Sequence, residues 1–184
     1  MRRRRLRTLR PTPDRPPRVQ ILSPRAPLLA LAAALLALPA SAQRPAAPQA
    51  PAGAIAIIVH ARVPVENLSF GQLRRVFLGD QQYWPDRSRV TLLVRAPVAA
   101  ERSVVLSRIY QMDEARFRQY WIAKMFRAEV AAGPKLVYSN EGAQNLVAMI
   151  PGAITFMPAS RVGPGVKVLR IDGKLPTDAG YPLQ

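Results

Sequence analysis

Three uninterrupted runs of apolar, often β-branched residues constrain the fold of this chain more than any other feature. They are AIAIIVH at residues 54–60, VTLLV at residues 90–94 and AITFM at residues 153–157. A strand with one face in water alternates apolar and polar residues, and these runs do not alternate. Each is therefore expected to be a strand that is covered on both faces. Because helical patterns separate the runs, we expect an α/β domain with a largely parallel sheet.

Helix signals lie between the strands. Ser69 followed by Gln72 predicts a capping box, and Gly79 predicts the end of the same helix. A second helix is expected over residues 99–110. Residues 166–171, VKVLRI, alternate in polarity as an edge strand does.

A further helix is expected to begin after Asp113, which is a suitable cap. Within it, Phe117, Trp121 and Met125 recur at the spacing of one helical face, so all three are expected to face the core. A short strand is expected within KLVY, residues 135–138, after the Gly-Pro pair that ends this helix.

The N-terminal region has the pattern of an export signal. Residues 26–38 form an apolar run of 13 residues, which is too short to span a bilayer comfortably. A basic region precedes the run, and Ala40 and Ala42 after it supply the small-x-small cleavage pattern. We expect residues 1–42 to be a signal peptide that is cut after Ala42. An uncleaved anchor and a short core helix are the alternatives.

The domain organisation follows from this boundary. Residues 43–52, QRPAAPQAPA, are rich in proline and alanine and lack a hydrophobic period, so we expect a disordered linker. The folded α/β domain is expected over residues 53–184. A cleaved signal peptide implies a periplasmic location, with membrane contact only during export.

The net charge of +16 suggests a nucleic-acid partner at first sight, but its distribution argues against one. Residues 1–42 hold nine of the 27 basic residues and one of the 11 acidic residues, so 18 basic and 10 acidic residues remain and leave +8. This excess is spread over many segments and lacks an aromatic RNA-binding motif. We therefore expect no nucleic-acid partner.

Enzyme and metal chemistry find little support in the residue types. The chain has no cysteine, which excludes disulfides and thiolate metal sites, and its one histidine, His60, has no carboxylate cluster nearby. We expect His60 to be structural and no metal to bind. No phosphate loop, dinucleotide fingerprint or nucleophile–base pair is visible, so neither a cofactor nor an enzymatic activity is expected.

The stretch RAPVAAER, residues 95–102, is the most suggestive local feature. It joins a predicted strand to a predicted helix, where free backbone amides near Ala99 and the guanidinium of Arg95 can converge on an anion. The alternative is that Arg95 pairs with Glu101 or another carboxylate and ties the strand to the helix. The pair Tyr83-Trp84 poses a similar choice, since a loop aromatic can line a cleft or cover the end of the sheet.

Two longer segments carry a resemblance to a known family. Residues 65–95, VENLSFGQLRRVFLGDQQYWPDRSRVTLLVR, and residues 146–160, LVAMIPGAITFMPAS, resemble phosphate-binding, type 2 periplasmic solute-binding proteins. The resemblance spans roughly residues 55–160. It implies a type 2 periplasmic binding protein-like single lobe, with a mainly parallel sheet flanked by helices.

The resemblance also implies how the stretch after Arg95 differs from a working site. In full transport receptors of that family, the matching arginine opens an R-S-D-G-S-G-T loop whose hydroxyls and amides hold phosphate. Here residues 96–100 are Ala, Pro, Val, Ala and Ala, and Glu101 stands at the threonine position. Hydroxyl donors are lost, and Glu101 adds a negative charge.

Two functions remain open on these grounds. The first is an exported solute-binding-like protein that binds phosphate or a similar small oxyanion for an ABC transporter, with a permease or another periplasmic protein as partner. The second is a protein-interaction or sensor module on the same scaffold, with ligand binding lost.

Ser139 or Asn140 is expected to cap a helix. The candidate ligand-binding residues are Arg95, Ala99, Ala100, Arg102, Trp84 and Ser139.

Overall fold

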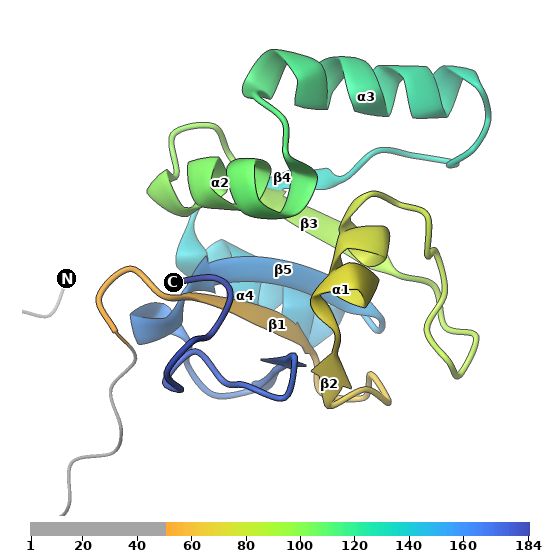
Figure 1. Cartoon of the computed structure of the whole chain (residues 1–184). Coiled ribbons are helices and arrows are strands. Elements are labelled where there is room, and N and C mark those ends of the chain that lie inside the picture. The colour runs from red at the N-terminus through yellow and green to blue at the C-terminus, as the bar shows by residue number, and fades with distance from the viewer. Residues whose placement is uncertain (1–50) are drawn as a thin grey trace, which may run out of the picture. The chain divides into compact units, whose positions relative to one another are not determined.

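The computed structural model describes residues 51–184, which alternate between strands and helices (Figure 1). The predicted signal peptide, residues 1–42, and most of the predicted linker lie outside the described residues. A π-helical turn, Leu106–Tyr110, continues the helix Ala100–Val105, and a 3-10 turn, Ala159–Arg161, follows the strand Ala153–Pro158. The helices and strands are β1 (Ile55–His60), β2 (Asn67–Leu68), α1 (Phe70–Phe77), β3 (Thr91–Arg95), α2 (Ala100–Val105), α3 (Glu114–Phe126), β4 (Lys135–Val137), α4 (Asn140–Met149), β5 (Ala153–Pro158), β6 (Val166–Val168) and β7 (Arg170–Ile171).

Five strands form the central sheet, in the order β4-β3-β5-β1-β6. β3 runs parallel to both of its neighbours, β4 and β5, whereas β1 runs antiparallel to β5 and β6. α1 and α2 lie on one face of the sheet and α4 on the other (Figure 1). The α/β class expected from the sequence is confirmed.

β1 shows why its sequence is apolar throughout. Ile55, Ile57 and Val59 join the hydrophobic cluster on the α1 side of the sheet, while Ala56 and Ile58 join the cluster on the α4 side. Because successive side chains of a strand point to opposite faces, a strand covered on both faces must be apolar at every position. The prediction for this run is confirmed.

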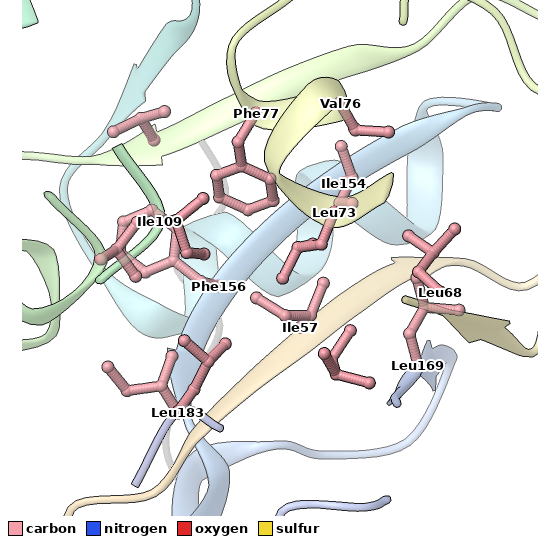
Figure 2. Close-up of a cluster of buried hydrophobic side chains, with 14 of the residues drawn as sticks. Ile57, Leu68, Leu73, Val76, Phe77, Ile109, Ile154, Phe156, Leu169 and Leu183 are labelled. Atoms are coloured by element: carbon pink, nitrogen blue, oxygen red, sulfur yellow. The ribbon is translucent and has the colours of Figure 1, made fainter. Parts of the chain in front are cut away.

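The larger cluster lies between the sheet and α1. Figure 2 shows Leu73 and Phe77 of α1 directed towards Ile57 of β1 and Phe156 of β5. The rings of Phe77 and Phe156 have their centroids 6.2 Å apart. This packing fixes α1 against the middle of the sheet.

The ends of α1 follow the predicted signals. The Ser69 Oγ accepts a hydrogen bond from the Gln72 amide at 3.2 Å, and the Gln72 Oε1 accepts one from the Ser69 amide at 2.8 Å, which completes the capping box. Gly79 has a φ of 72°, and a Cβ there would lie 2.8 Å from the Trp121 ring. Glycine at this position therefore ends α1 and lets α3 approach it closely.

α3 confirms two of its three predicted core residues. The Asp113 side chain caps the helix by accepting a hydrogen bond from the Arg116 amide at 2.7 Å, and Phe117 and Trp121 are buried. The prediction for Met125 is wrong, because its side chain is 43% exposed. Its sulfur lies near Gly133, in the connection to β4, rather than against the core. The last turn of α3 is covered on its other side, where the buried Lys124 donates a hydrogen bond to the Leu78 carbonyl.

The predicted edge strand over residues 166–171 is divided in the structure. Val166–Val168, which is β6, pairs with β1 at the edge of the central sheet, as expected. Arg170–Ile171, which is β7, instead pairs in parallel with β2 in a separate two-stranded sheet. Leu169 between them is buried in the larger cluster.

Candidate functional site

Arg95 ends β3 and lies in the interior. Its side chain is only 6% exposed and that of Glu101 only 10%. The Arg95 Nε donates a hydrogen bond to the Glu101 Oε1 at 2.8 Å, and Nη1 donates a longer one to the Val137 carbonyl at 3.4 Å. Glu101 belongs to the first turn of α2, so this ion pair ties β3 to α2. The pairing is the alternative that the sequence left open for Arg95.

Arg102 extends the same network towards α3. Its Nε and Nη2 donate to the two carboxylate oxygens of Glu114, at 2.5 and 3.0 Å, and its Nη1 donates to the Arg95 carbonyl. The guanidinium also lies 4.9 Å from the centre of the Phe117 ring. The hydrogen bond from Arg102 lowers the pKa of the Glu114 carboxyl below its ordinary value. Both buried guanidinium groups therefore have a carboxylate partner, as buried charges require.

The remaining residues of the turn offer only backbone. Ala99 is the N-cap of α2 and makes no side-chain cap hydrogen bond, and Ala100 is exposed. Ser139 caps α4 directly after β4, where its Oγ accepts a hydrogen bond from the Gly142 amide at 2.9 Å. Because Val137 of β4 lies opposite Arg95 in the parallel register, Ser139 follows at the same edge of the sheet.

Trp84 does not belong to this group. It is 2% exposed, and its Nε1 donates a hydrogen bond to the Gly152 carbonyl at 2.9 Å. Gly152 precedes β5, and β5 begins opposite the first residue of β3, so Trp84 lies at the other end of the sheet from Arg95. Of the two placements considered for this residue, its burial and its hydrogen bond to Gly152 fit a ring that covers the end of the sheet.

Two charged residues, Glu114 and Lys124, bind partners that the sequence did not predict. Glu114 has an obvious local explanation as an acid in the first helical turn, and nothing local points to Arg102, twelve residues away. Lys124 did leave a signal, because it shares a helical face with the buried Phe117 and Trp121. Its Nζ donates to the Leu78 carbonyl at 3.0 Å and to the Asp80 carboxylate. Burial alone would lower the pKa of Lys124, but hydrogen bonds to Asp80 and Tyr120 raise it.

The chemistry available within residues 51–184 is limited. This part of the chain contains no group of three His, Cys, Asp or Glu side chains placed to hold a metal ion. His60 uses its Nδ1 to accept a hydrogen bond from the Arg62 amide at 3.0 Å in the turn after β1. None of the helices described for these residues is long and apolar enough to cross a membrane.

Comparison with known proteins identifies the fold. No protein-family model matches the chain, and no curated protein matches it in sequence. Three solved structures similar to this chain include a phosphate transport receptor. An ABC-type phosphate transport receptor from Vibrio cholerae is 22% identical, with a TM-score of 0.58 over 71% of this chain and 52% of that one.

The other two structures agree with this result. A protein from Clostridium perfringens, assigned as a phosphate ABC transporter substrate-binding protein and solved with bound phosphate, is 18% identical, with a TM-score of 0.53 over 65% of this chain and 45% of that one. PstS from Borrelia burgdorferi is 12% identical, with a TM-score of 0.51 over 66% of this chain and 48% of that one. This chain has their fold and spans about half the length of each.

Proposed function

We propose that this chain is an exported, periplasmic interaction or sensor module that uses the scaffold of one solute-binding-protein lobe and does not carry phosphate. The observation that supports this proposal is the buried bond between Arg95 and Glu101, at 2.8 Å. An oxyanion at Arg95 would have to reach a side chain that is 6% exposed and compete for a charge that Glu101 already neutralises.

The energies favour the internal pair. A charge-assisted hydrogen bond to an incoming anion contributes about 1.5–3 kcal/mol. Removing the partner from a buried ion pair costs about 3–5 kcal/mol, because a charge is left without a counterion. Displacement of Glu101 by phosphate is therefore unfavourable, and the hydroxyl groups that would offset it are absent from residues 96–100.

Phosphate and sulfate titrations by calorimetry test the proposal. We expect no heat of binding at millimolar anion for the wild type. Glu101→Thr should gain weak binding, because it frees Arg95 and restores a hydroxyl, and the further change Arg95→Ala should abolish that gain. Micromolar phosphate binding by the wild type, lost in Arg95→Ala, would contradict the proposal and support an oxyanion carrier with a transporter permease as its partner.

A further inference from the structure

A cavity of about 310 Å³ lies near the start of β3, at the other end of the sheet from Arg95. It is bounded by the end of α1, the start of β3, α3 and the connection to β4. β3 begins at Thr91, but the register of β4 begins only with Lys135 opposite Leu93. The first residues of β3 therefore have no strand on that side. The connecting residues 131–134, Ala-Ala-Gly-Pro, are too small to fill the gap.

The cavity has one apolar wall. Val76, Trp121 and Val130 line it, and all three belong to the buried core. The indole N–H of Trp121 is buried and has no acceptor within residues 51–184. A buried donor without a partner is uncommon in folded proteins. Because this nitrogen has almost no accessible surface, a ligand in the cavity would meet carbon atoms of the indole rather than its N–H.

The polar part of the lining is cationic. Arg89 and Lys135 both line the cavity, and no Asp or Glu of residues 51–184 does so. Neither side chain belongs to an ion pair within these residues. The two acids that adjoin the cavity in sequence, Asp80 and Glu129, are bound by Lys124 and Arg127. The two lining cations are thus free for a ligand, in contrast to the paired Arg95.

We infer that this cavity binds a small organic anion with an apolar body. A carboxylate of the ligand lies between Arg89 and Lys135, and its hydrocarbon part packs against Trp121, Val76 and Val130. The volume is at the lower end of the range for small-molecule sites, about 300–1,000 Å³. A small tetrahedral oxyanion would leave the apolar wall uncovered. The inference goes beyond the proposed function and does not depend on Arg95.

Phenylacetate is the probe, with phenylacetamide as its uncharged analogue and inorganic phosphate as an anion without an apolar body. We expect saturable heat with phenylacetate on the wild type, and binding at least tenfold weaker for the other two compounds. Arg89→Gln and Lys135→Gln should each weaken phenylacetate binding about tenfold, as the loss of one charge-assisted contact predicts. The control is Arg62→Gln, which removes the same charge from an exposed arginine outside the cavity and should change nothing.

Tryptophan fluorescence locates the site. The chain has two tryptophans, Trp84 and Trp121, so Trp84→Phe leaves Trp121 as the only reporter. Phenylacetate should change its emission with the affinity that calorimetry gives. If Trp84→Phe fails to fold, calorimetry of Arg89→Gln, Lys135→Gln and Arg62→Gln decides alone.

Three results would overturn the inference: no saturable binding at ten-millimolar phenylacetate, equal weakening by Arg62→Gln, or no weakening by either cavity variant. Phosphate binding that depends on Arg95 but not on Lys135 would instead contradict the proposed function and leave this inference standing.

Discussion

Removing one partner of the ion pair between Arg95 and Glu101 should lower the free energy of unfolding far more than replacing both partners with apolar side chains. Arg95→Met removes the guanidinium and leaves the Glu101 carboxylate, 10% exposed, without its partner. The Val137 carbonyl remains satisfied, because it also accepts a hydrogen bond from the Ala96 amide at 2.9 Å. The cost therefore comes from the Glu101 carboxylate, which is left buried without a counterion.

The expected magnitude is roughly 3 kcal/mol, the lower end of the range for breaking a buried pair. We take the lower end because Glu101 lies in the first turn of α2, where the helix dipole favours a negative charge. For a domain whose free energy of unfolding is about 5–15 kcal/mol, this is a large loss. The double variant Arg95→Met, Glu101→Leu places two apolar side chains in the same space and should unfold within about 1 kcal/mol of the wild type.

Urea unfolding followed by tryptophan fluorescence measures these differences. Arg62→Met is the matched control, because Arg62 is exposed, and it should change the free energy of unfolding by less than about 0.5 kcal/mol. A loss below about 1 kcal/mol in Arg95→Met would refute the reasoning. So would a double variant whose loss equals the sum of the two single losses, since that result means the residues are not coupled.

Three further predictions test other parts of the chain. Trp121→Ala should lower the free energy of unfolding by about 3–5 kcal/mol, and a change below about 1 kcal/mol in urea would contradict its place in the core. Arg102 lowers the pKa of Glu114 in the folded state, so the stability from this group is present above the ordinary value of 4.5 and is lost as pH falls through the lowered pKa. Glu114→Gln should therefore flatten the acid limb of stability against pH, and an unchanged limb would argue against the pair. N-terminal sequencing of exported protein should begin at Gln43, and recovery of residues 26–38 in a membrane fraction would contradict cleavage.

Caps and buried strands were predictable because their causes are local. Ser69 and Gln72 are three residues apart, and the bonds between them form wherever that helix begins. The apolar run in β1 is a direct consequence of burial on both faces. Such features need no knowledge of which distant segment provides the cover.

The candidate site was predictable only in part. Arg95 and Glu101 are six residues apart on one strand-to-helix turn, so their pairing was foreseen as an alternative. Arg102 and Glu114 belong to different helices, and their bond depends on how α2 and α3 pack. Met125 fits the apolar spacing of α3, but its side chain lies near Gly133 in the connection to β4 and is 43% exposed.

The sequence by itself determined the three buried strands β1, β3 and β5, the helices with their caps, and the loss of hydroxyl donors after Arg95, because each depends on neighbouring residues and on the spacing of apolar side chains. Only the tertiary structure decided the order of the strands, the antiparallel direction of β1, the burial of Trp84 and the cavity beside Arg89 and Lys135. These depend on contacts between residues far apart in the chain. Spacing along the chain says which face of an element is apolar, but not which other element covers that face or where a gap is left.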